Sequence, residues 1–181
     1  MNEVTGFVVW LTGLPASGKS TLANLLAQEI ETYGMPVQVL DSDEFRKVLT
    51  PQPTYSPEER KWFYDTLAYI GKLLAQNGVN VIFAATAHRS VYRHHARQHF
   101  PRFVEVYVKC PVELCMQRDQ KGLYQKAMSG EINNLPGVQQ LYEVPDAPAI
   151  VVDTGENSPT VCLEKILKRL GEFDYIPPKA M

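Results

Sequence analysis

The sequence has few cysteines, almost no net charge and no long apolar run, and each shortage excludes a class of protein. Its three cysteines, Cys110, Cys115 and Cys162, are odd in number and lack CxxC spacing, so we expect reduced structural thiols and neither disulfides nor zinc ligands. A net charge of -2 provides no basic field for nucleic acid. The N-terminal apolar segment, residues 7–11, is too short for a membrane span and has no basic flank. We therefore expect a cytoplasmic protein without nucleic-acid or membrane partners.

Short apolar runs alternate along the chain with longer helical patterns. The runs occupy residues 7–11, 37–40, 79–85, 103–108 and 149–152. This alternation is typical of an α/β fold with a parallel sheet, here of about five strands, covered by helices on both faces. A capping box at Ser56, Pro57 and Glu59 predicts a helix that runs to about Gln76. With 181 residues the chain is long enough for one such domain and short for two, so we expect a single domain over 1–181.

A complete phosphate-binding motif follows the first apolar run. Residues 13–20 read GLPASGKS, which matches GxxxxGK(S/T) between a predicted strand and a predicted helix. The pattern predicts a P-loop NTPase fold that binds ATP or GTP, because glycines let backbone N–H groups turn toward phosphates at a helix N-terminus. Lys19 would bridge the β- and γ-phosphates, and Ser20 would supply a hydroxyl to Mg²⁺. The predicted ATP-binding residues are Gly13, Leu14, Pro15, Ala16, Ser17, Gly18, Lys19, Ser20, Thr21 and Arg118.

Two aspartates follow the second apolar run, at the sheet edge where open α/β folds bind their ligands. A kinase needs a carboxylate that orients the acceptor hydroxyl and takes its proton, and a charge that helps to hold Mg²⁺. Asp41 and Asp43 are candidates for both tasks, and we favour Asp43 as the catalytic residue and as a metal ligand beside Ser20. For one of the two, a helix N-cap is an equally good interpretation. Arg46, one turn further on, would clamp an anionic acceptor.

The next helical pattern carries Arg60 and a stripe of apolar residues. We interpret the stripe as core contacts because helical spacing explains it, and Arg60 as the functional candidate. The stripe consists of Trp62, Phe63, Leu67, Ile70 and Leu74.

Four histidines occur within twelve positions of the chain. They are His88, His94, His95 and His99. No HExxH pattern accompanies them, and the neighbouring Arg93 and Arg97 would repel a cation. We therefore interpret them as a surface helical cluster and not as metal ligands.

A polar stretch over about 119–148 interrupts the alternation. It carries Gly122, Gly130 and Gly137 as candidate pivots, and Arg118 and Lys121 lie at its base. We predict a lid that closes over phosphates, with a solvated charged turn as the alternative for its first residues.

These segments together resemble the adenylylsulfate kinase family, which phosphorylates the 3′-hydroxyl of adenosine 5′-phosphosulfate. The resemblance rests on VVWLTGLPASGKST, LDSDEFR, YSPEER, FVEVYVKCPVELCMQRDQKGLYQKA and GEINNLPGVQQLYEVPDAPAIVVDT. It implies ATP and Mg²⁺ as cofactors and a nucleotide-like small molecule as acceptor, and it leaves a homodimer open. The acceptor-binding residues that it implies are Asp43, Arg46, Arg60, Lys121, Gly122, Leu123 and, in place of a stacking phenylalanine, Leu135.

The sequence departs from the family pattern mostly on the acceptor side. Residues 62–66 read WFYDT where the family has a polar, basic run, and Ala87 with His88 replaces a serine–proline pair. The second hypothesis is therefore a kinase of the same fold that acts on another nucleotide-linked or sugar-like hydroxyl. The third is a nucleotide-binding regulatory domain without catalysis.

Overall fold

A five-stranded sheet with the order β2-β3-β1-β4-β5 forms the centre of the molecule, in a computed structural model that describes residues 5–177. All four neighbouring pairs are parallel, as predicted. The strands are β1 (Val8–Thr12), β2 (Val37–Asp41), β3 (Asn80–Ala84), β4 (Phe103–Lys109) and β5 (Ile150–Asp153). The first strand thus lies in the middle of the sheet, and the loop that follows it opens at the centre of the carboxyl edge.

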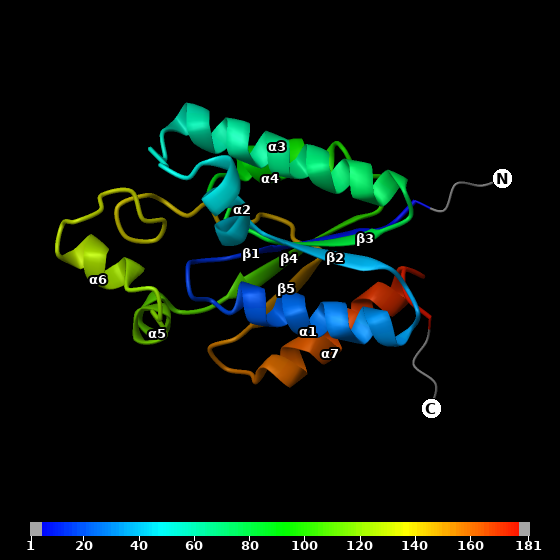
Figure 1. Cartoon of the computed structure of the whole chain (residues 1–181). Coiled ribbons are helices and arrows are strands. Elements are labelled where there is room, and N and C mark those ends of the chain that lie inside the picture. The colour runs from blue at the N-terminus through cyan, green and yellow to red at the C-terminus, as the bar shows by residue number, and fades with distance from the viewer. Residues whose placement is uncertain (1–4, 178–181) are drawn as a thin grey trace.

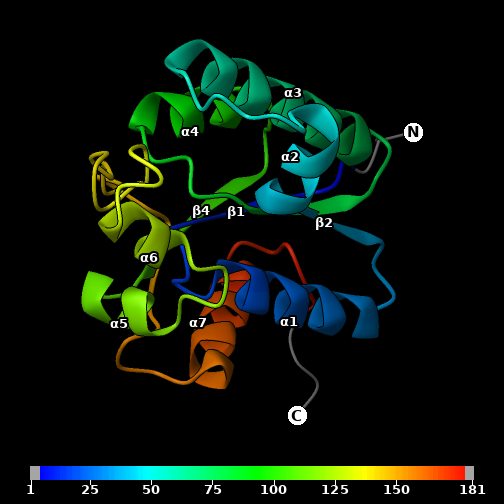
Figure 2. The same ribbon diagram turned by 60° about the vertical axis from the view of Figure 1, so that its left-hand side comes forward.

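Helices cover both faces of the sheet, which confirms the predicted layers. On one face lie α1 (Lys19–Thr32) and α7 (Pro159–Glu172), and on the other lie α3 (Pro57–Gln76) and α4 (Ser90–Arg97) (Figure 1). Three short helices, α2 (Ser42–Leu49), α5 (Val112–Gln117) and α6 (Leu123–Met128), complete the domain. Of these, α5 and α6 lie together beyond the carboxyl ends of the strands (Figure 2). No helix within residues 5–177 is long and apolar enough to cross a membrane.

The long helix α3 begins as the sequence predicts. Ser56 Oγ accepts a hydrogen bond from the Glu59 amide, and Pro57 occupies the first turn. Such a cap stabilises a helix by about 1 kcal/mol. The Glu59 carboxylate turns to Thr54 and Arg46 instead of closing the box on Ser56. The start of α3 is therefore tied to the loop before it and to α2.

Strand residues alternate between two apolar cores. Val9 and Leu11 pack with the buried faces of α1 and α7, whereas Val8 and Trp10 pack with α3 and α4. Complete burial of one such side chain contributes about 1.5–3 kcal/mol. Phe63 and Leu67 of the predicted stripe belong to the second core. Trp62 does not, since it is 49% exposed, and its assignment to the core was wrong.

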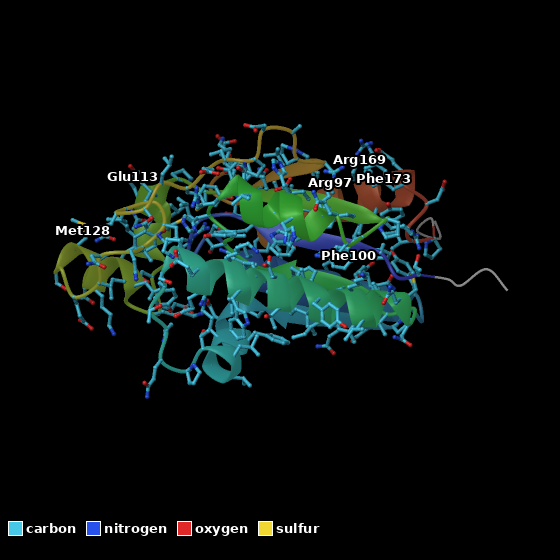
Figure 3. The ribbon with its side chains drawn as sticks, turned by 90° about the horizontal axis from the view of Figure 1, so that it is seen from above. Arg97, Phe100, Glu113, Met128, Arg169 and Phe173 are labelled. Atoms are coloured by element: carbon cyan, nitrogen blue, oxygen red, sulfur yellow. The ribbon has the colours of Figure 1, made fainter. Side chains whose placement is uncertain are left out.

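A third apolar cluster lies at the end of the molecule that carries α5 and α6. Viewed from above, Glu113 of α5 and Met128 of α6 lie at this end, and Arg169 and Phe173 at the other (Figure 3). Its buried members are Cys110, Cys115, Tyr124, Ala127 and Leu135, with Leu14 and Ala16 of the P-loop packed against them. The stretch that the sequence presents as polar thus has a small core of its own.

Candidate active site

The phosphate-binding loop wraps the N-terminus of α1 tightly. Gly18 has a φ of 96° and precedes α1, and a Cβ on Gly13 would lie 2.4 Å from the Val108 carbonyl oxygen. Lys19 Nζ donates to the carbonyls of Gly13 at 3.1 Å and Leu14 at 2.7 Å. Burial lowers the pKa of Lys19 to about 8, although Asp43 opposes this shift. The loop therefore holds a buried cation at the N-terminus of α1, a position suited to a polyphosphate.

Asp41 and Asp43 have separate tasks in the structure. Asp41 Oδ1 caps α2 by accepting from the Asp43 amide at 2.8 Å, and its Oδ2 accepts from Ser20 Oγ at 2.5 Å. Asp43 Oδ2 pairs with Lys121 Nζ at 2.5 Å. Ser20 thus meets Asp41, whereas we expected Asp43 beside it. Oxygen ligands from one hydroxyl and one carboxylate suit Mg²⁺, which keeps several waters and substrate oxygens in its shell.

A cavity of about 500 Å³ joins these groups. Of the predicted residues, Pro15, Ala16, Gly18, Lys19, Ser20, Thr21, Asp41, Asp43, Arg118, Lys121 and Leu123 line it. The volume lies within the range of small-molecule sites. The lining also includes Asp119 and Gln120 of the predicted lid. Four further lining residues were not predicted, namely Thr86, Thr154, Asn157 and Pro159. The position of Thr86 and Thr154 just after β3 and β5 is the signal that would have indicated them, because ligands bind at the carboxyl edge.

Arg118 closes one wall of the cavity. Its Nη2 donates to the Thr154 carbonyl at 2.9 Å, and Thr154 Oγ1 donates to the Ser17 carbonyl at 2.8 Å. The end of β5 is in this way connected to the P-loop on one side and to the base of the predicted lid on the other.

The predicted lid packs against the P-loop. Asp119 accepts from the amides of Leu123 at 2.9 Å and Tyr124 at 2.6 Å, and Gly122 has a φ of 66°, so both shape the start of α6. Tyr124 Oη donates to the Pro15 carbonyl at 3.0 Å. Leu135 is only 5% exposed and belongs to the third apolar cluster. This cluster joins the lid to α5 and to Leu14 and Ala16 of the P-loop.

Two buried arginines occupy the predicted acceptor side, outside the lining of the large cavity. Arg46 lies over the Phe63 ring, 3.9 Å from its centroid, and its Nη1 pairs with Glu59 at 3.2 Å. Its Nη2 is buried without a hydrogen-bond partner among the described residues. Arg60 donates from Nε to the Tyr55 carbonyl and from Nη2 to the Asn134 carbonyl, each at 3.0 Å. One carboxylate and two guanidiniums leave this region cationic.

The histidines divide into two groups. His94 is exposed on α4, His95 pairs with Asp65 at 2.8 Å, and His99 is half-buried. His88 is buried beside Arg60, so its assignment to the surface was wrong. Within residues 5–177 no three His, Cys, Asp or Glu side chains come together as a metal site.

The sheet order, the loop after β1 and the carboxylates at the end of β2 define a P-loop phosphotransferase. A family model described as adenylylsulphate kinase matches residues 5–153. The chain therefore belongs to the adenylylsulphate kinase family.

Individual relatives cover nearly the whole chain. It is 40% identical over 172 residues to a probable adenylyl-sulfate kinase of Pyrococcus abyssi, covering 95% of this chain and 99% of the relative. It is 41% identical over 174 residues to a probable bifunctional SAT/APS kinase 2 of Sorangium cellulosum, covering 96% of this chain and 30% of that relative. The structure of the Mycobacterium tuberculosis APS kinase CysC in complex with AMPPNP and APS superposes with a TM-score of 0.87 at 31% identity, covering 92% and 98% of the two chains.

Proposed function

We propose that this chain transfers the γ-phosphate of ATP to the 3′-hydroxyl of adenosine 5′-phosphosulfate (APS). The observation that carries the proposal is the convergence of Lys19, the Ser20–Asp41 pair and Asp43 on one cavity in a member of this family. The M. tuberculosis relative was solved with an ATP analogue and APS together. The products would be ADP and 3′-phosphoadenosine 5′-phosphosulfate (PAPS).

On the donor side, the P-loop amides, the N-terminus of α1 and Lys19 would bind the phosphates of ATP. Lys19 is held by two carbonyls of its own loop, and its charge would offset the negative charge that accumulates during transfer. Arg118 and Thr154, which also line the cavity, would contact the rest of the nucleotide.

Ser20 and Asp41 would hold Mg²⁺, which neutralises charge on the β- and γ-phosphates when it is bound. This assignment moves the metal role that we expected for Asp43 to Asp41, because Asp41 is the carboxylate that contacts Ser20. Asp43 keeps the role of general base. The acceptor oxygen bonds to the γ-phosphorus, the bond to the β-phosphate oxygen breaks, and the hydroxyl proton passes to the Asp43 carboxylate.

Arg46 and Arg60 would bind the anionic part of the acceptor. Both are buried, and Glu59 is the one carboxylate paired with either of them among the described residues. A desolvated, incompletely neutralised pair of guanidiniums favours a ligand with two negative charges. The phosphosulfate group of APS has that character.

We also propose that residues 119–148 act as a lid. Lys121 links this segment to the proposed general base, since its Nζ contacts the Asp43 carboxylate. Burial lowers the pKa of Lys121, but the hydrogen bond and charge of Asp43 raise it by more. Lys121 would leave Asp43 when phosphates offer it a stronger partner. The proposal also includes the cytoplasm, the compartment that supplies ATP, as the location of the protein. It includes a homodimer as the assembly.

The decisive assay uses purified protein with ATP, Mg²⁺ and APS, and detects PAPS and ADP by mass spectrometry. We expect both products in equal amounts, and their loss in Lys19→Ala. Absence of product above background at millimolar APS would overturn the proposal. A parallel screen of nucleotide-linked and sugar-like hydroxyls tests the second candidate, which the apolar Phe63 beneath Arg46 favours.

A further inference from the structure

The loop after β3 contains a strained residue that is not glycine. Ala87 has a φ of 38°, in the left-handed region that residues with a Cβ seldom adopt. Its amide donates to Tyr64 Oη at 3.0 Å, and its carbonyl accepts from Arg93 Nη1 at 2.7 Å. Such strain persists where the surroundings hold the backbone firmly.

The groups that hold this loop are themselves buried. Arg93 is 2% exposed and pairs through Nε with Glu105 at 2.9 Å, while its Nη2 donates to the Glu143 carbonyl at 2.7 Å. The Glu143 amide in turn donates to the His88 carbonyl at 2.8 Å. The backbone on both sides of the Ala87–His88 peptide is thus fixed by α3, by α4 and by the end of the predicted lid.

The fixed loop directs the imidazole of His88 to Arg60. His88 is 3% exposed, and its Nδ1 lies 3.5 Å from Arg60 Nη1. The other two nitrogens of Arg60 donate to backbone carbonyls, those of Tyr55 and Asn134. Arg60 forms no ion pair with a carboxylate in the described part of the chain. Two of its nitrogens therefore donate to neutral carbonyls, the third faces the imidazole, and its charge stays available to a ligand.

We propose that His88 is a positioning residue, whose Nδ1 accepts from Arg60 and so holds this guanidinium ready for the anionic part of the acceptor. The inference rests on the acceptor role proposed for Arg60.

The local charges support a neutral imidazole. Burial, and then the charges of Arg60, Arg89 and Arg93, together lower the pKa of His88 to about 4, against the opposing charge of Glu143. At neutral pH the ring is uncharged, so Nδ1 has a free lone pair when Nε2 carries the proton. A charged ring would repel Arg60 and could not accept from it.

Steady-state kinetics test the role. We expect His88→Ala to raise the KM for APS about tenfold, with the KM for ATP unchanged and kcat within about twofold, because one hydrogen bond that orients Arg60 is lost. His88→Asn, which restores an acceptor oxygen, should recover most of the loss. His94→Ala, an exposed position on α4 just after this loop, is the matched control and should behave as the wild type. An unchanged KM for APS in His88→Ala would overturn the inference.

A second measurement does not depend on activity. In ¹⁵N NMR spectra of the wild type, assigned by comparison with His88→Asn, the His88 ring should be the tautomer protonated at Nε2, and its Nδ1 signal should shift in Arg60→Ala. A proton on Nδ1 would overturn the inference even if the enzyme is active. If the wild type has no activity on APS, the proposed function is wrong. The tautomer of the His88 ring would still decide whether His88 accepts a hydrogen bond from Arg60.

Discussion

The donor and acceptor halves of the site are built in different ways. The proposed donor half centres on one continuous segment, residues 13–20, in which backbone amides and Lys19 would bind the phosphates. The acceptor half gathers side chains from α2, α3 and the loop after β3, which aromatic rings, a buried ion pair and the strained Ala87 hold in place. A contiguous motif can be carried intact between proteins, whereas an assembled surface changes whenever one of its distant supports changes.

Loss of Lys19 should produce the largest effect and test the donor half alone. Lys19→Ala removes the cation that spans the phosphates, so we expect turnover to fall by at least about a hundredfold. Circular dichroism and acceptor binding should stay normal. Lys47→Ala, a change of an exposed lysine paired with Glu44, is the control. A folded Lys19→Ala variant with near-normal turnover would show that the donor site is elsewhere.

Variants of the two aspartates should separate the phosphate-transfer step from metal binding. Asp43→Asn removes the base, so we expect kcat to fall by about a hundredfold while the KM for ATP stays near the wild-type value. Asp41→Asn should instead raise the Mg²⁺ concentration needed for half-maximal rate. Titrations of rate against Mg²⁺ in both variants decide the assignment. A strong Mg²⁺ dependence in Asp43→Asn, and none in Asp41→Asn, would exchange the two roles.

Acid should destabilise the acceptor half through His88. Its pKa of about 4 lies below the ordinary 6.5, so below pH 6.5 the unfolded chain binds a proton that the folded chain does not. The free energy of unfolding should therefore fall by about 1 kcal/mol per pH unit between those values. Urea unfolding of wild type and His88→Asn at pH 7 and pH 5 measures the difference. If the free energy of unfolding falls equally in the two proteins, His88 is not the cause of the destabilisation by acid.

Hydrogen exchange should show the smallest effect, in the segment that both halves share. Residues 119–148 should gain protection with a nonhydrolysable ATP analogue, and more with APS added, because Lys121 and Arg118 then acquire phosphate partners. The central strands serve as the internal reference. Equal, high protection without ligand, with analogue and with both ligands would mean that the segment is a fixed part of the fold.

The sequence predicted what is local and periodic. The strands, the layers and the P-loop follow from patterns within a few residues, and so does the cap at Ser56. The sequence could not show that Asp41 caps α2 while contacting Ser20, since both roles suit either aspartate. Nor could it place His88, which lies 28 positions from Arg60, because their contact depends on how α3 packs against the loop after β3.

The apolar cluster that joins Leu14 and Ala16 to α6 and Leu135 has a consequence for engineering. A lid transplanted from another kinase would bring its own small core, and that core would have to fit these two side chains. A poor fit would disturb the loop that cradles the phosphates, and nucleotide affinity would fall together with the intended change in acceptor. Redesign of the acceptor preference should therefore begin at positions 63 and 88 and leave residues 123–135 intact.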